Sequence, residues 1–499
     1  MLTLHTIVRR AALFAALSLP LAASFVGCAN RGGGRVAPHA AARGITIDGD
    51  TSDWPRAAAS LADAHYVYFR VGVENQQMPI QASTESLALW LDADGDPATG
   101  QRMDKPTDAA SLGVDLVLEF SPRKDDGTLG RGVSGYAIDA TGNKTPVSQG
   151  AVELVVSPST GGPQFEIRLA RRTDEPSTAE MVLAGPARNA RAMFVIADAT
   201  GKITGWSDPE SFVMPASADG PARASALLPV KRPGTIRVVS YNVLKSALMA
   251  NDAPFRRVFQ VLQPDVVLLQ EWDTDEATAR AWFSAMVTGN AEWHARSTGK
   301  DVVIVSPYPI ESLGLDGITI DSPDGSSANP VRYIAGVVKT PLGDVAAASV
   351  HLKCCGTAGS PEDIKRINEA RAIQAAMRGG LGDSGPRLRV IGGDLNLVGS
   401  TTPLDAIRVG LDADGSELMI APTRVLGDAA FYTWMDPKSE FPAGRLDYLL
   451  FSDASADVVN AFVFDTTRLD DASLFRLGLD RADTASSDHK PIVLDLKPR

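Results

Sequence analysis

From Ile236 to the C-terminus, apolar runs of strand length alternate with amphipathic stretches. Residues 252–263, DAPFRRVFQVLQ, repeat their apolar positions with a helical period and predict a helix. PDVVLLQ at 264–270 and RLRVIGG at 387–393 are continuous apolar runs, which predict buried strands. Strands that alternate with helices are typical of an α/β fold.

A second helix is expected over SPEDIKRINEARAIQAAMRG, residues 360–379. Pro361 stands in its first turn, and acidic residues follow, as is favourable at a helix N-terminus. We expect Gly379 and Gly380 to end the helix. Its predicted apolar stripe consists of Ile364, Ile367 and Ile373.

The pattern differs between about Gly44 and Leu228. Short alternating runs bounded by Gly, Pro and Asp predict an all-β sandwich without a long amphipathic helix. A Pro-containing joint, LLPVKRPGT, separates the halves, so we expect domains at 44–228 and 235–499. The strand candidates in the first half are YVYFRVGV, SLALWLDA, VDLVLEF, VELVVS, QFEIRLA and RAMFVIADA.

The first 28 residues resemble an export signal. Arg9 and Arg10 precede an apolar stretch that is short for a membrane span and ends in FVGC at Cys28. This ending resembles a bacterial lipoprotein box, which implies a lipidated Cys28 and a membrane-anchored protein outside the cytoplasm. The alternative is ordinary secretory cleavage near Ala22 or Ala29. Residues 29–43, rich in Gly, Ala and Arg, predict a flexible tether.

Composition narrows the function classes. At 499 residues the chain is long enough for two folded units, and 44% of it is hydrophobic. A net charge of -12 argues against a protein that coats nucleic acid, because such binding depends on Lys and Arg neutralising phosphates. Besides Cys28 only Cys354 and Cys355 remain, so there is no disulfide framework. We interpret this pair as small apolar side chains, with a redox or metal-related role as the alternative.

Polar side chains interrupt or end several strand-like runs of the second half, in VVSYNVL, VVLLQEW, ASVHLK, VIGGDLNL, RLDYLLF and SSDHKPI. Carboxylates, amides and imidazoles placed repeatedly at strand ends are what a metal-assisted phosphoester hydrolase needs, and a plain core does not require them. The sequence therefore predicts an enzyme. The residues concerned are Asn242, Glu271, His351, Asp394, Asn396, Asp447, Asp488 and His489.

With these motifs in this order, residues 235–499 resemble the endonuclease/exonuclease/phosphatase superfamily. The resemblance implies a four-layer α/β sandwich with two central mixed β-sheets and a site at one end of the strands. It also implies a divalent cation, Mg²⁺ or alternatively Mn²⁺, bound mainly by Glu271 with support from Asn242 and Asp488. Mg²⁺ fits because it prefers carboxylate and water oxygens.

The same resemblance implies the catalytic roles. Asp394 would position and deprotonate the attacking water, and Asn396 would donate to a phosphate oxygen. His489 would contact the phosphoryl group as a base or as a transition-state stabiliser, with Asp447 accepting from its other ring nitrogen. His351 would face the phosphate from the opposite side; the alternative is a structural histidine.

The first half resembles family-nine-like carbohydrate-binding modules through ITIDGDTSDWP at 45–55 and LWLDADGDPATG at 89–100. The resemblance implies a structural Ca²⁺ held by Asp92, Asp94 and Asp96, and a solvated acidic turn is the alternative. Trp54, Trp90 and Tyr68 are candidate sugar-stacking platforms, although aromatic residues buried in a sandwich core are the simpler interpretation.

Three functions follow as hypotheses. The first is a surface-anchored phosphodiesterase or phosphatase acting on lipid headgroups, sugar phosphates or other small phosphoesters. The second is a secreted nuclease, and the third is a glycan-binding protein with a non-catalytic second domain. Asp301 before VVIVS and Pro307 after it depart from the family pattern near the substrate, and Trp434 and Phe441 are candidate pocket walls.

Overall fold

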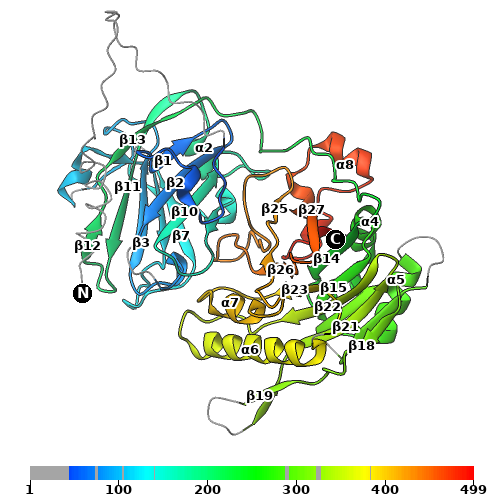
Figure 1. The fold of residues 1–499 in the computed structure, drawn as a ribbon. Helices are drawn as coiled ribbons and strands as arrows, with labels where there is room; N and C mark the ends of the chain where they lie inside the picture. Colours follow the sequence, from blue (N-terminus) through cyan, green and yellow to red (C-terminus); the bar gives the residue numbers. More distant parts are fainter. Residues whose placement is uncertain are drawn as a thin grey trace, which may run out of the picture.

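The computed structural model describes residues 44–499 except 74–76, 104–105, 140, 287–291, 300, 322–326 and 383 (Figure 1). The predicted signal segment 1–28, with Cys28, and the predicted tether 29–43 lie outside the described residues. Within the described part, no helix is both long and apolar enough to cross a membrane.

The N-terminal half is built from two antiparallel sheets, in the orders β1-β2-β10-β9 and β12-β11-β3-β6-β7-β8, with β13 paired to β11. Their inward-facing apolar side chains form one core, which confirms the predicted β-rich architecture. Each of the six predicted strand segments contains a strand. The strands are β1 (Ser60–Ala62), β2 (Tyr66–Gly72), β3 (Ser86–Asp92), β6 (Leu116–Phe120), β7 (Val133–Ile138), β8 (Lys144–Pro146), β9 (Val155–Ser157), β10 (Gln164–Ala170), β11 (Arg188–Ala197), β12 (Ile203–Trp206) and β13 (Glu210–Met214), with the ribbon β4 (Gln101–Arg102) and β5 (Gly113–Val114) and one short helix, α2 (Thr178–Leu183).

Two mixed sheets form the centre of the C-terminal half. The first has the order β16-β17-β15-β14-β28-β27-β25 and the second β18-β21-β22-β23-β26-β24. In each sheet a parallel pair, β14 with β15 and β22 with β23, is flanked by antiparallel neighbours. The strands are β14 (Ile236–Asn242), β15 (Val266–Trp272), β16 (His294–Ser297), β17 (Asp301–Ser306), β18 (Ile310–Ser312), β21 (Tyr333–Thr340), β22 (Gly343–His351), β23 (Leu388–Asp394), β24 (Met419–Ile420), β25 (Arg424–Val425), β26 (Asp447–Phe451), β27 (Ala456–Val463) and β28 (Ile492–Pro498), with a separate ribbon, β19 (Thr319–Asp321) and β20 (Ala328–Pro330).

Helices cover the outer faces of both sheets, so the half has four layers, as predicted (Figure 1). Apolar side chains of the two sheets meet between them; Val238 and Leu268 of the first pack in one cluster with Val338 and Val390 of the second. Separate apolar clusters lie outside each sheet. The helices are α3 (Ala247–Ala250), α4 (Asp252–Leu262), α5 (Glu276–Met286), α6 (Pro361–Leu381), α7 (Thr402–Arg408) and α8 (Asp471–Leu477).

The predicted apolar stripe of α6 is only partly correct, since Ile373 is fully buried but Ile364 is not. Ile364 is 45% exposed, whereas Asp363 and Arg366 are buried and paired with each other. Arg366 also donates to the backbone oxygens of Lys353 and Cys355, at 2.6 and 3.1 Å. A buried ion pair that binds a neighbouring loop takes the place of the expected Ile, which a hydrophobic pattern alone cannot show. The helix also continues to Leu381, beyond the predicted glycine stop.

The two halves share an apolar core. Val155↔Ala443 and Ile47↔Ala430 are backbone bridges between them, and buried side chains from both halves pack around these bridges. Arg168 on β10 forms a bidentate ion pair with Asp428, and both side chains are almost completely buried. The cluster comprises Ile45, Ile47, Trp54, Tyr66, Tyr68, Val155, Ala170, Val425, Ala430, Tyr432, Ala443 and Val463. The predicted domain boundaries at 228 and 235 stay a prediction, although the described strands do leave a gap from Met214 to Ile236.

We expect Arg168→Ala to destabilise the protein by about 3–5 kcal/mol, because it leaves the Asp428 carboxylate buried without its charge partner. Urea unfolding of the full chain measures this change. The matched control is Arg256→Ala, which removes an exposed helical ion pair with Asp252 and should cost at most about 1 kcal/mol. Equal effects of the two substitutions would contradict a structural role for the interface pair.

Candidate active site

Strand register brings three candidate residues side by side at one end of the second sheet. His351 ends β22, Asp394 ends the parallel strand β23, and Asp447 begins the antiparallel strand β26. Asp394 is the register partner of both His351 and Asp447. The carboxyl ends of parallel strands and the amino ends of their antiparallel neighbours lie at the same end of a sheet. The polar residues at the ends of these three strands therefore lie next to one another.

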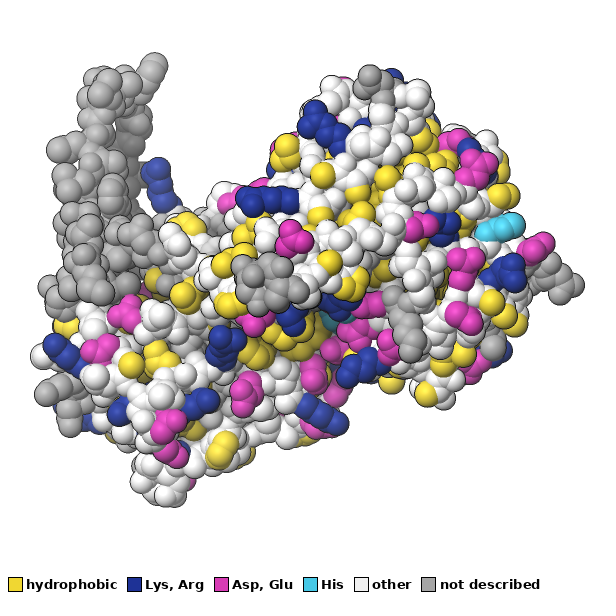
Figure 2. Space-filling model, turned by 90° about the horizontal axis from the view of Figure 1, so that it is seen from below, with side chains coloured by type: hydrophobic (Ala, Val, Ile, Leu, Met, Phe, Trp, Pro, Cys, Tyr) yellow, Lys and Arg dark blue, Asp and Glu magenta, His cyan; other side chains and the backbone are white. Residues whose placement is uncertain are grey.

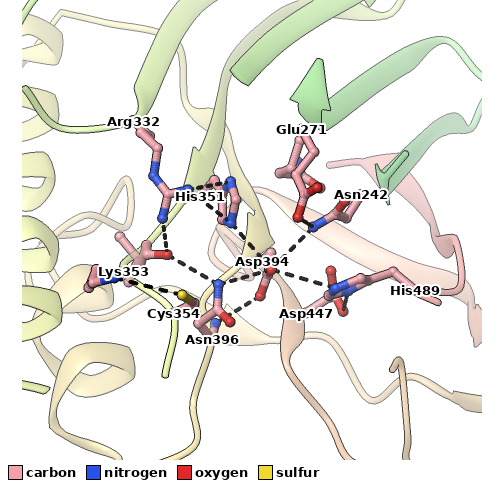
Figure 3. Close-up of polar contacts among 12 residues, drawn as sticks. Asn242, Glu271, Arg332, His351, Lys353, Cys354, Asp394, Asn396, Asp447 and His489 are labelled. Atoms are coloured by element: carbon pink, nitrogen blue, oxygen red, sulfur yellow. Dashed lines mark hydrogen bonds and ion pairs between the residues drawn. The ribbon is translucent and has the colours of Figure 1, made fainter. Parts of the chain in front are cut away.

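Asp394 is at the centre of the site (Figure 3). Its carboxylate accepts hydrogen bonds from the backbone NH of Asn396 at 2.9 Å, from the Asn396 amide at 3.0 Å and from the Asn242 amide at 3.2 Å. The Nε2 atoms of His351 and His489 lie 3.6 and 3.7 Å from the same carboxylate oxygen. The hydrogen bonds from Asn396 and Asn242 compensate for the burial of a carboxylate that is only 2% exposed.

The backbone next to Asp394 is closely packed. Gly393 has a φ of +151°, and a Cβ there would lie 1.9 Å from the carbonyl oxygen of Val350. Asn396 adopts a left-handed φ of 49°. Only glycine fits at position 393, so the Gly-Gly-Asp-Leu-Asn motif lets strand β23 turn into the site while staying paired to β22.

His489 is held by a buried hydrogen-bonded chain. Its Nδ1 donates to Asp447 at 2.8 Å, as the family resemblance implies, and Thr433 Oγ1 donates to the same carboxylate oxygen at 2.6 Å. Burial alone would lower the pKa of His489, but the negative charges of Asp447 and Asp394 and the hydrogen bond to Asp447 raise it to about 10. The Asp447 contact fixes the tautomer and directs Nε2 toward Asp394.

The structure supplies His351 with its own carboxylate partner, which sequence reasoning missed. His351 Nδ1 contacts Asp301 Oδ1 at 2.6 Å, and Arg332 forms an ion pair with Asp301 at 3.2 Å. Burial alone would raise the pKa of Asp301, but the His351 hydrogen bond and the charges of His351 and Arg332 lower it. In the sequence, Asp301 stands out only as a departure from the family pattern. Nothing in the sequence pairs it with a residue fifty positions away.

The donor set beside Asp394 fits a divalent cation. Glu271, in a left-handed backbone conformation at the end of β15, accepts from the Asn242 amide at 3.1 Å and from the Lys245 NH at 3.0 Å. Asp488 accepts from Trp434 Nε1 with one oxygen, and its other oxygen is buried without a partner among the described residues. Glu271, Asp394 and Asp488 line one cavity. Hard carboxylate oxygens, one of them unpaired, are the ligands that Mg²⁺ prefers. The grouping of this half whose ligand atoms lie within 4.8 Å of one another, among the described residues, is Asp394 with Asp447 and His489.

In the N-terminal half, the structure brings Asp92 and Asp94 together with Asp115, and Asp96 is outside this group. The Asp92 and Asp115 carboxylates accept backbone NH groups of Gly95, Gly113 and Ala93. Burial raises the pKa of Asp115 to about 7. The Ca²⁺ site stays a prediction.

The aromatic candidates for sugar stacking are mostly in the interior. Trp54 and Tyr68 are each 5% exposed, and Trp54 Nε1 donates to Glu166 at 2.6 Å. Trp90 is half-buried against an apolar cluster of the sandwich. The rings of Trp54 and Tyr68 therefore offer no open face for a sugar.

The fold and the site together define a phosphoester hydrolase of the α/β-sandwich class. The sequence profile of the Endonuclease/Exonuclease/phosphatase family matches residues 239–489, and the chain belongs to this family. No curated protein sequence matches the chain.

Among solved structures, the chain is similar to the human Nocturnin catalytic domain with bound sulfate, at 18% identity over 54% of this chain and 97% of that one, with a TM-score of 0.36. Truncated TDP2 from Caenorhabditis elegans is 16% identical over 54% and 100% of the two chains, with a TM-score of 0.36. Sphingomyelinase C from Streptomyces griseocarneus is 17% identical over 52% and 99%, with a TM-score of 0.32.

In metal-free protein, we expect Asp447→Asn to lower the pKa of His489, because it removes the nearest negative charge. The folded wild type keeps a proton that the unfolded chain loses above about pH 6.5, so its free energy of unfolding should fall as the pH rises toward about 10. The variant should show a weaker fall. NMR titration of the imidazole and urea unfolding across this pH range measure both effects.

Asp457→Asn is the control for this experiment, since Asp457 pairs with Arg499 at the exposed surface. It should leave the His489 pKa and the pH slope unchanged. Identical titration of His489 in wild type and Asp447→Asn would show that Asp447 does not set its protonation.

Proposed function

We propose that the protein is a Mg²⁺-dependent hydrolase of small phosphoesters. One observation carries the proposal: two histidine–carboxylate pairs, His489–Asp447 and His351–Asp301, approach Asp394 from two sides, next to Glu271. Membership of a family of phosphoester hydrolases supports the reaction class.

In the proposed reaction, water attacks phosphorus in line with the ester oxygen. Asp394 accepts the proton of the water, and the P–O ester bond breaks as the leaving oxygen takes a proton from His351. His489, directed by Asp447, donates to a phosphoryl oxygen that gains negative charge in the transition state. The Asn396 amide donates a hydrogen bond to Asp394 in the structure, so we propose that its main role is to orient that carboxylate. Donation from Asn396 to phosphate remains the prediction made from the sequence.

Glu271 and Asp488 would hold the cation, with Asn242 orienting Glu271 through its amide. When bound, Mg²⁺ or Mn²⁺ would neutralise charge on the phosphoryl oxygens. The proposed active site therefore combines the residues assigned from the sequence with Asp301, which the structure adds.

The other two hypotheses are less well supported. A nuclease that binds long nucleic acid would gain little from a chain with a net charge of -12. A glycan-binding protein without catalysis would not need Glu271, Asp394, Asp447 and His489 to remain. Three of them, Glu271, Asp394 and His489, line one cavity. The cavity, of about 760 Å³, has the size of small-molecule sites.

We expect Asp394→Asn to reduce turnover by at least about 10²-fold without unfolding the protein, because the group that receives the water proton is lost. The assay uses the full chain with Mg²⁺ against bis-p-nitrophenyl phosphate, inositol phosphates, sphingomyelin, RNA and plasmid DNA. Chelation by EDTA should abolish turnover, and Mg²⁺ should restore it. Asp457→Asn is the control. Near-normal turnover in folded Asp394→Asn would contradict the proposed mechanism.

Anchoring to the cell envelope is also part of the proposal and is supported by the FVGC sequence at Cys28. We expect Cys28→Ser to shift the protein from the membrane fraction to the soluble extracytoplasmic fraction, since the acylated thiol is lost. Fractionation followed by immunoblotting measures this shift. Cys355→Ser is the control, and unchanged membrane association of Cys28→Ser would contradict lipidation.

A further inference from the structure

The cavity above Asp394 has walls from both halves of the protein. Glu271, Asp394 and His489 form its catalytic side, and Trp434 and Phe441 of the C-terminal half also line it. The N-terminal sandwich closes another side, and Figure 2 shows hydrophobic, acidic and basic side chains meeting where the left and right parts of the molecule adjoin. The residues contributed by the sandwich are Pro79, Gln81, Ala82, Arg131, Val156 and Ser159.

Hydrogen bonds fix this wall against the catalytic half. Val133 NH donates to the backbone oxygen of Glu440 at 2.7 Å, and Ser159 Oγ donates to that of Arg445 at 2.9 Å. Gln149 donates its amide to the backbone oxygens of Asp436 and Ser439, at 2.8 and 3.1 Å. The loop that carries Trp434 and Phe441 is thus attached to the sandwich. These hydrogen bonds hold the wall in a fixed position relative to the catalytic residues. The apolar core shared by the two halves also holds it there.

Two polar side chains of this wall make no side-chain hydrogen bond within the described part of the chain, although hydrogen bonds to Glu362, and to a smaller extent the charge of Arg131, lower the pKa of Glu362. Gln81 is only 7% exposed, and its Oε1 atom is buried without a partner among the described residues. Arg131 is exposed toward the same cavity, and no hydrogen bond or ion pair of its guanidinium occurs within the described part of the chain. Gly132 NH donates to the Gln81 backbone oxygen at 2.7 Å, so the two residues are held next to each other.

The backbone at this point is shaped for close contact. Gly132 has a φ of +88°, and a Cβ there would lie 2.6 Å from the backbone oxygen of Glu440. Glycine therefore allows the turn that brings Arg131 to the cavity while the strand begins at Val133. The Gln81 amide can bind an anionic group only through its NH₂, because its oxygen is a hydrogen-bond acceptor. The Arg131 guanidinium beside this amide can form a bidentate pair with a phosphate or a carboxylate.

We propose that Gln81 and Arg131 form a second, anion-binding subsite, and that the substrate is a small phosphoester carrying a second anionic group, as a bisphosphate does. The inference rests on the proposed function, since the reacting phosphate occupies the Asp394 side. The apolar surfaces of Ala82, Val156 and Phe441 then contact the body of the substrate between the two anionic groups. The sandwich acts as a specificity element of the hydrolase.

The test compares paired substrates that differ by one phosphate: inositol bisphosphate with inositol monophosphate, and adenosine bisphosphate with adenosine monophosphate. In the full chain with Mg²⁺, the bisphosphates should have the higher kcat/KM. Arg131→Ala should lower the ratio of kcat/KM between bisphosphate and monophosphate by about 10-fold or more, because a charge-assisted hydrogen bond to the second phosphate is lost. Arg131→Lys should recover part of this ratio.

Arg123→Ala is the matched control, since Arg123 is an exposed arginine of the same half that does not line the cavity. It should leave the ratio unchanged. Equal loss on both members of each pair in Arg131→Ala, or no loss on either, would overturn the subsite.

Binding gives a readout that does not depend on turnover. Calorimetry on the full-length Asp394→Asn protein should show tighter binding of the bisphosphates, and additional Arg131→Ala should remove this preference. Equal affinity for mono- and bisphosphates before the second substitution would overturn the subsite. Failure of the proposed function is separate: it would appear as undiminished hydrolysis of bis-p-nitrophenyl phosphate by Asp394→Asn.

Discussion

The burial of the Asp394 carboxylate is the constraint on which the rest of the site depends. A charge removed from water is costly unless donors replace the lost hydration. Asn242 and Asn396 supply those donors, the two histidines lie beside the same carboxylate at 3.6 and 3.7 Å, and all four come from different segments. The site can therefore form only when both sheets are in register, so catalytic geometry and folding of the C-terminal half are coupled.

The same constraint explains the partners of the histidines. An imidazole near a buried carboxylate needs a fixed tautomer to present a donor to it, and Asp447 and Asp301 each accept from the far ring nitrogen. Thr433 and Arg332 then bind these two carboxylates. Polar contacts extend in this way outward from Asp394 through both histidines to a further partner of each carboxylate.

Strand and helix positions could be predicted from the sequence because apolar periodicity depends on local spacing. The roles of Asp394, Asp447 and His489 came from motifs in a fixed order, which is information about a family. Contacts between distant segments escaped this reasoning. Asp301 and Asp115 are single acidic residues whose partners lie across a sheet or loop, and the Asp363–Arg366 pair buries charge on a helix face where apolar residues were expected. Long-range polar pairing leaves no periodic trace in a sequence.

The packing of the two halves against each other bears on the role of the N-terminal sandwich. A module joined by a free tether would carry its own ligand site and leave the enzyme's cavity open. Here the stacking candidates Trp54 and Tyr68 pack instead into the core shared with the C-terminal half. Aromatic surface that a glycan-binding module would expose is used to attach the sandwich to the hydrolase. Two polar residues of the sandwich, Gln81 and Arg131, line the reaction cavity. The N-terminal half is therefore positioned to influence substrate specificity, whereas the catalytic residues lie at the strand ends around Asp394.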